Sequence, residues 1–138
     1  MKLQRYREAA ADWTKAVELD TGAMRRIFRR QQALCHARGG EAAPATAAAE
    51  VLAKETNLSG AELVELARIH ALIAALLKET SQSEPHAAQA EEFLKQAQAK
   101  GVSVGVKFRD DPDFAVLKGR PVFEALTSPA KQTPPAKP

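Results

Sequence analysis

The stretch RYREAAADWTKAVELD, residues 5–20, has the pattern of one amphipathic helix. Its larger and smaller apolar residues recur three and four positions apart, which places them on a single helical face: Tyr6, Ala9, Trp13, Ala16 and Val17. The whole chain is rich in alanine, and aromatic residues make up only 5% of it. This composition favours helix over sheet. We therefore predict an all-α fold in which another helix packs against this face.

Start and stop signals divide the chain into five predicted helices. Gly22, the pair Gly39-Gly40 and Gly101 mark helix ends, and Ser59 followed by Glu62 spells a capping box before a long apolar run. Because the turns between the helices are short, neighbouring helices should be antiparallel. The predicted helices cover residues 3–19, 23–38, 41–55, 60–79 and 84–100.

The pattern changes after Gly101. Short apolar groups are broken by Pro112, Gly119 and Pro121, which favours one-turn helices near 111–117 and 120–126 over strands. We call residues 102–128 the capping segment and assign residues 1–128 to one helical repeat domain. The proline-rich stretch PAKQTPPAKP, residues 129–138, is predicted to be a disordered tail.

Three of the predicted helices share one spelling. Each carries a small residue, then a second residue four positions on, then an apolar residue three positions further, in the sets Ala9–Trp13–Ala16, Ala45–Ala49–Leu52 and Ala90–Leu94–Ala97. Small residues at these positions allow close approach of a neighbouring helix. The recurrence predicts stacked helical pairs.

These residues resemble the tetratricopeptide repeat (TPR) family. Tyr6, Ala9, Trp13 and Ala16, followed by VELD at 17–20, resemble the second helix of a repeat, and Gly40 resembles the turn glycine of the next one. The stretch FRDDPDFAVLKGRPVFEALTS, residues 108–128, is similar to the closing segment of bacterial TPR proteins. The resemblance covers residues 5–128. It implies a short α-solenoid of antiparallel helix pairs, with no catalytic activity of its own and a protein or peptide as its partner.

The alanine-rich style and the ending look most similar to the repeat arrays that follow kinase domains in planctomycete serine/threonine kinases. The chain opens on what resembles the second helix of a pair. We therefore expect it to be the C-terminal part of a larger repeat protein or kinase. Part of the face around Trp13 should then be exposed, or covered through self-association.

Several short motifs look catalytic but lack their necessary partners. Asp20-Thr21-Gly22 spells the aspartic-protease triplet, which requires a second carboxylate that shares a proton, and the chain has no second copy. The Ser128–Lys131 stretch spells a serine-acylase motif but leads into the proline-rich tail. We predict that the chain is not an enzyme.

The candidate metal ligands are also poorly grouped. Asp110, Asp111 and Asp113 surround Pro112, which predicts a capped turn rather than a cation site. No histidine has a Cys or His partner at ligand spacing, so each is interpreted as an ordinary helix or cap residue: His36, His70 and His86. We predict no metal, no cofactor and no small-molecule substrate.

The location of the protein follows from what the sequence lacks. Its only cysteine is Cys35, so no internal disulfide can form, which suits a reducing compartment. The most apolar stretch, LARIHALIAALL at 66–77, is too short to cross a membrane and contains Arg68 and His70. The first ten residues have no signal-peptide core. We predict a cytoplasmic protein that does not bind membranes.

The basic residues gather near the N-terminus, in MRRIFRR at 24–30. Residues 1–38 contain nine Lys or Arg against four Asp or Glu, whereas residues 39–100 contain five against nine. In an α-solenoid, the first helix of each pair lines a concave groove. The candidate partner-binding residues are Arg25, Arg26, Arg29, Arg30, Glu62, Glu65 and Arg68. An acidic peptide is expected at the arginine end.

A helical module that binds nucleic acid through the same arginines is the alternative, because basic stripes also bind phosphate backbones. The acidic middle region weakens this hypothesis, and we therefore consider a nucleic-acid partner the less favoured one.

Overall fold

The computed structural model describes residues 2–19 and 24–128, and this part of the chain is all-helical, as predicted. Five longer helices come first: α1 (Lys2–Leu19), α2 (Met24–Arg38), α3 (Ala42–Ala53), α4 (Gly60–Leu76) and α5 (Ser83–Ala99). Three short ones follow: α6 (Val106–Arg109), the 3-10 helix η1 (Pro112–Leu117) and α7 (Pro121–Thr127). The predicted tail at 129–138 and the triplet Asp20-Thr21-Gly22 lie outside the described residues.

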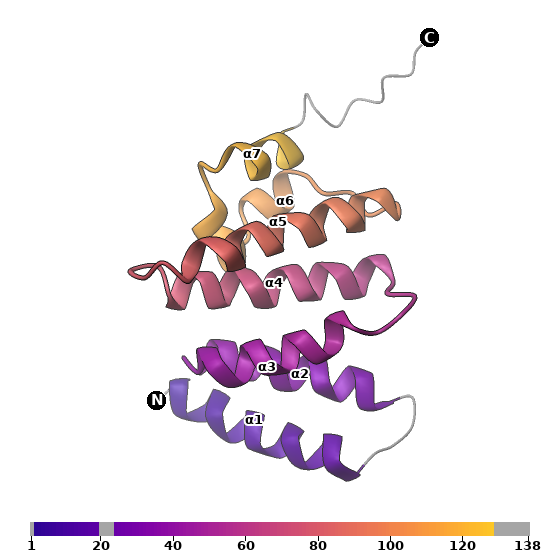
Figure 1. Ribbon diagram of the computed structural model, residues 1–138, viewed down its shortest axis with the longest axis vertical. Coiled ribbons are helices and arrows are strands. Elements are labelled where there is room, and N and C mark those ends of the chain that lie inside the picture. The colour runs from indigo at the N-terminus through magenta and orange to yellow at the C-terminus, as the bar shows by residue number, and fades with distance from the viewer. Residues whose placement is uncertain (1, 20–23, 129–138) are drawn as a thin grey trace.

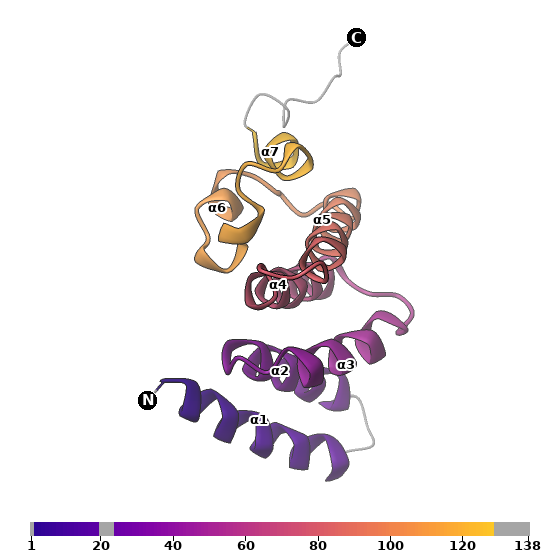
Figure 2. The same ribbon diagram turned by 60° about the vertical axis from the view of Figure 1, so that its left-hand side comes forward.

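The helices are stacked from one end of the molecule to the other (Figure 1). α1 packs on α2, α2 and α3 form a hairpin, and α4 and α5 form a second hairpin. The capping segment lies against this second hairpin, at the end of the stack opposite α1 (Figure 2). The described residues contain no helix long and apolar enough to span a membrane.

Two glycines are required by the turns that join these helices. Gly40 has a φ of 81°, a conformation that side-chain-bearing residues rarely adopt, and the chain then reverses into α3. At the start of α4, a Cβ on Gly60 would lie 2.5 Å from Val102 Cγ2, so any other residue there would force Val102 to move. The predicted capping box is present, since Ser59 Oγ accepts from the Glu62 amide at 3.1 Å and the Glu62 carboxylate accepts from the Ser59 amide at 2.9 Å.

The shared spelling of the helices is buried in α3 and α5. Ala45, Ala49 and Leu52 are at most 2% exposed, and their counterparts in α5 are fully buried. In α1 the predicted face is only partly correct. Val17 is buried, but Tyr6, Ala9, Trp13 and Ala16 are half-buried, and the fully buried position is Ala10. The physical reason is that α1 ends the stack and packs mainly on α2, whereas α3 and α5 each belong to a hairpin in the interior.

The capping segment is built around three phenylalanines. It consists of short helices, as predicted, and the described residues contain no strand. The Phe114 ring lies 5.6 Å from Phe108 and 6.3 Å from Phe123, and Phe114, Leu117 and Phe123 are fully buried. The predicted turn around Pro112 is confirmed, because the Asp111 side chain caps η1 by accepting from the Asp113 amide at 2.9 Å.

The helix ends differ from the prediction by a few residues. α4 ends at Leu76, three residues before the predicted position, because the Thr80 hydroxyl donates to the Leu77 carbonyl at 2.8 Å and closes a turn there. α3 ends at Ala53 rather than at 55. Its Pro44 lies in the first turn, where the missing N–H is tolerated.

Candidate functional site

The predicted partner-binding residues lie on two helices that pack together, α2 and α4. Arg26 of α2 forms an ion pair with Glu62 of α4, with 2.7 Å between Nε and Oε2, and also donates to the Thr56 carbonyl at 3.3 Å. Partial burial would raise the pKa of Glu62, but the hydrogen bonds from Ser59 and the charges of Arg26 and Arg30 outweigh it and lower that pKa. Arg26 and Glu62 therefore tie one hairpin to the next.

Arg68 is engaged in the same way with the capping segment. Its Nη1 donates to Asp111 and to Asp113 at 2.8 Å each, and its guanidinium lies 5.2 Å from the centre of the Phe114 ring. Arg38, at the end of α2, donates to Asp113 at 2.7 Å. Burial would raise the pKa of Asp113, but Arg68 and Arg38 outweigh it and lower that pKa. The aspartates around Pro112 thus bind arginines as well as capping a turn, which the sequence did not indicate.

The other arginines of α2 have no such partner. Arg25 is exposed and Arg29 and Arg30 are half-buried, and no carboxylate in residues 2–19 or 24–128 lies within ion-pair distance of any of them. We call these three residues the arginine cluster. The Nε atom of Arg30 is buried without a hydrogen-bond partner. Glu65 of α4 is half-buried and forms no ion pair with the described residues.

The arginine cluster is electrostatically unfavourable for α2 itself. Arg25 and Arg29 are four residues apart, a spacing at which like charges destabilise a helix by a few tenths of a kcal/mol. Arg25 also lies in the first turn of α2, which contains no acidic residue, and a cation there opposes the helix dipole. Negative charge brought to this surface would relieve both effects.

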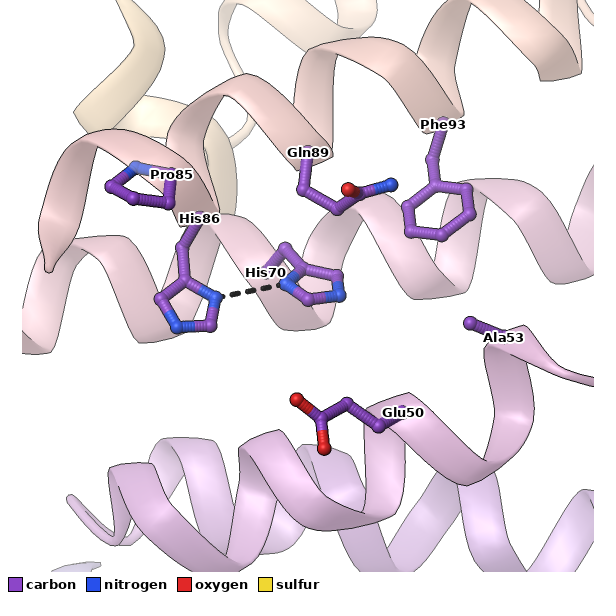
Figure 3. Close-up of a pocket in the computed structure, with 7 residues that line it drawn as sticks. All are labelled: Glu50, Ala53, His70, Pro85, His86, Gln89 and Phe93. Carbon is purple, nitrogen blue, oxygen red and sulfur yellow. Dashed lines mark hydrogen bonds between the residues drawn. The ribbon is translucent and has the colours of Figure 1, made fainter.

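A second feature is a cavity of about 290 Å³ between α3 and the α4–α5 hairpin, which we call the histidine cavity (Figure 3). Nδ1 of His70 on α4 lies 3.0 Å from Nδ1 of His86 on α5. The two ring centroids are 5.2 Å apart, so the nitrogens face each other between the rings. The cavity is lined by Glu50, Ala53, His70, Pro85, His86, Gln89 and Phe93.

Both histidines of this pair are held neutral. Burial, together with the nearby His86, lowers the pKa of His70 to about 4. Burial also lowers the pKa of His86, although the Glu50 carboxylate opposes this shift. The Phe93 ring lies next to His70, with the two centroids 5.6 Å apart and the ring planes 27° from parallel. One N–H···N hydrogen bond between two neutral rings satisfies this geometry.

The sequence interpretation of His70 and His86 as ordinary helix residues did not include the contact between their rings. His70 and His86 are sixteen positions apart, far outside metal-ligand spacing, but they lie on the two antiparallel helices of one hairpin. The predicted pairing of these two helices as antiparallel neighbours was the one signal in the sequence that could have brought the two histidines together. His36, by contrast, lies 3.0 Å from the Glu41 carboxylate in the turn after α2, a local contact.

The described residues contain no group of three or more His, Cys, Asp or Glu side chains that could hold a metal ion. Cys35 is half-buried, and burial raises the pKa of its thiol, which disfavours the reactive thiolate.

Comparison with protein-family models, with curated proteins and with solved structures gives no match to this chain. The function is therefore argued from the two features described above.

Proposed function

We propose that this chain is a non-catalytic protein-interaction module of the cytoplasm, a short TPR-like α-solenoid whose arginine cluster binds an acidic segment of a protein partner. Two helical hairpins stacked between α1 and the capping segment support the solenoid part of the proposal. The repeated burial of the small–large pattern in α3 and α5 also supports it.

One observation carries the binding part of the proposal. Arg26, Arg38 and Arg68 are used in ion pairs within the fold, whereas no described carboxylate lies within ion-pair distance of Arg25, Arg29 or Arg30. Three like charges on one helix attract carboxylates by Coulomb interaction, and arginine binds a carboxylate through two parallel hydrogen bonds. Of the seven residues expected to bind a partner, Arg25, Arg29 and Arg30 are the ones we retain for direct contact.

The test begins with a displayed library of random peptides, selected against the full chain. Enriched peptides should contain clusters of Asp and Glu. Their affinity is then measured by fluorescence anisotropy for the unmodified chain and for the double variant Arg25→Glu/Arg29→Glu. Each exposed charge pair contributes up to about 1 kcal/mol, so reversing two charges should weaken binding by about tenfold or more.

Lys15→Glu is the matched control, because Lys15 is an exposed cation on the adjacent α1, outside the arginine cluster. Its affinity for the peptide should change by less than about threefold. Enrichment of peptides without acidic residues, or equal binding by both variants, would contradict the proposal.

Direct binding to DNA, measured at increasing salt concentration, distinguishes a nucleic-acid partner of the arginine cluster from a protein partner. Binding to duplex or single-stranded DNA that persists near physiological ionic strength and is lost in the double variant would favour the nucleic-acid alternative. We expect no such binding, because Glu62 and Glu65 lie on the adjacent helix.

A further inference from the structure

The histidine cavity has two chemically different walls. His86, His70 and Phe93 stand side by side along the wall formed by α4 and α5, and the Glu50 side chain points toward them from α3 on the other side (Figure 3). Ala53, with its small side chain, lines the α3 side of the cavity next to Glu50. The cavity therefore combines a wall of three neighbouring rings with one carboxylate across from it.

The hydrogen-bonding capacity of the histidine pair follows from counting its protons. Two neutral imidazoles carry two N–H groups and two unprotonated nitrogens. The contact between the Nδ1 atoms uses one N–H and one unprotonated nitrogen. One ring then retains an Nε2–H donor, and the other retains an unprotonated Nε2, which is a hydrogen-bond acceptor.

The charge of the cavity is negative. Glu50 is the one residue lining it that is charged when both histidines are neutral. Its side chain is exposed, and it forms no ion pair within the part of the chain that the structure describes. Besides the two histidines, α4 and α5 contribute Pro85, Gln89 and Phe93 to the cavity. None of these side chains, nor the neutral histidines, supplies a positive charge at neutral pH.

We infer that the histidine cavity binds the guanidinium group of an arginine side chain from a protein partner. A planar cation with five N–H donors matches a carboxylate and a ring-nitrogen acceptor, and its flat surface stacks on aromatic rings. Lysine matches less well, since its ammonium is a compact point charge without a flat face. None of the cavity residues belongs to α2, so this site is separate from the arginine cluster.

This inference rests on the proposed function in one respect, namely that the arginine belongs to a protein partner. The cavity itself is tested with a small probe. The full chain is titrated with N-acetyl-arginine N-methylamide at pH 7.5 in the presence of EDTA. The ring Cε1–H signals of His70 and His86 are followed by NMR.

The neutral isostere N-acetyl-citrulline N-methylamide is the matched ligand control, because it differs by the charge and one nitrogen of the guanidinium. We expect saturable shifts of both histidine signals with the arginine probe, and binding about tenfold weaker with the citrulline probe. The Glu50→Gln variant should bind the arginine probe about fivefold more weakly. Glu79→Gln, an exposed carboxylate that does not line the cavity, should leave the affinity unchanged.

Absence of saturable shifts, or equal binding of the two probes, would overturn the inference. Retention of full affinity in Glu50→Gln would also overturn it, because the carboxylate would then have no part in binding. The proposed function fails by a different result, namely that no acidic peptide is enriched or that Arg25→Glu/Arg29→Glu binds the peptide as tightly as the unmodified chain. The two outcomes are measured with different ligands and different variants.

Discussion

The arginine cluster of α2 and the arginines of α4 and the capping segment are used in opposite ways. In α4 and the capping segment, Arg68 pairs with Asp111 and Asp113, Arg109 pairs with Glu124 at 2.6 Å, and Arg120 pairs with Glu84 at 2.6 Å and with Glu91 at 3.0 Å. In α2, the three residues of the arginine cluster form no close ion pair within the described part of the chain.

This difference follows from what each region must hold together. The capping segment consists of helices of seven residues or fewer, which cannot be stable alone and need directional contacts with α4 and α5. The buried Glu91 carboxylate illustrates this, because it accepts from Arg120 and also from the Phe123 amide at 3.2 Å. α2 is long and packs on α1, α3 and α4, so it forms without neutralising all of its charges.

The largest expected effect on stability comes from removing the Phe114 ring at the centre of the capping segment. Phe114 is fully buried between Phe108, Phe123 and the Arg68 guanidinium. Replacing it with alanine leaves a cavity and should lower the free energy of unfolding by about 3–5 kcal/mol, measured by urea denaturation. Val122→Ala is the control, since Val122 is exposed, and it should cost less than about 1 kcal/mol. Equal costs would mean that the capping segment does not pack as described.

The second effect concerns acid. His70 has a pKa of about 4 in the fold and about 6.5 when unfolded, so the unfolded chain takes up a proton first as the pH falls. The stability from neutral His70 is complete above pH 6.5 and is lost as the pH falls toward 4. Between pH 6.5 and 4.5 the loss from this group should be about 2 kcal/mol.

The His70→Gln variant isolates this contribution from the carboxylates that also titrate in acid. Its free energy of unfolding should fall less steeply between pH 6.5 and 4.5 than that of the unmodified chain. Identical pH profiles would show that His70 is not held neutral by burial.

The third effect tests the N-terminal end of the stack. Trp13 is half-buried and lies 5.4 Å from the Phe28 ring, and Leu19 of the same helix is 86% exposed. Trp13→Ala should lower the free energy of unfolding by about 1–2 kcal/mol, less than Phe114→Ala, because less of the ring is removed from water. If Trp13→Ala lowered the free energy of unfolding as much as Phe114→Ala, the α1 end of the stack would be as well packed as the capping segment, which would contradict this account.

The sequence was sufficient to predict the helices because their signals are local. The capping box at Ser59, the glycines at 39–40 and the helical spacing around Leu63 each act within a few residues. The face of α1 was predicted less well, since burial there depends on how many helices surround it. The buried Ala10 differs from the half-buried Ala9 only by its orientation toward α2.

The candidate sites depend on contacts between residues far apart in the sequence. Nothing local to Arg68 or Asp113 indicates that their side chains meet at 2.8 Å across 45 residues. Nor does the sequence distinguish the paired Arg26 from the unpaired Arg25 beside it, because that difference arises from the position of Glu62 on α4. The histidine pair was missed for the same reason.

The smallest stability effect provides the most direct test of the central claim, which is that the arginine cluster is unfavourable in the free protein and favourable in a complex. The free energy of unfolding of Arg25→Glu/Arg29→Glu is measured together with its affinity for the selected acidic peptide. The variant should be more stable than the unmodified chain by about 0.5 kcal/mol. A carboxylate at position 25 suits the first turn of α2, and one at position 29 lies three residues after Arg26, while the two new like charges repel each other as the two arginines did. Its affinity should fall by about tenfold or more. A variant that loses stability, or one that binds the peptide as tightly as the unmodified chain, would contradict the claim.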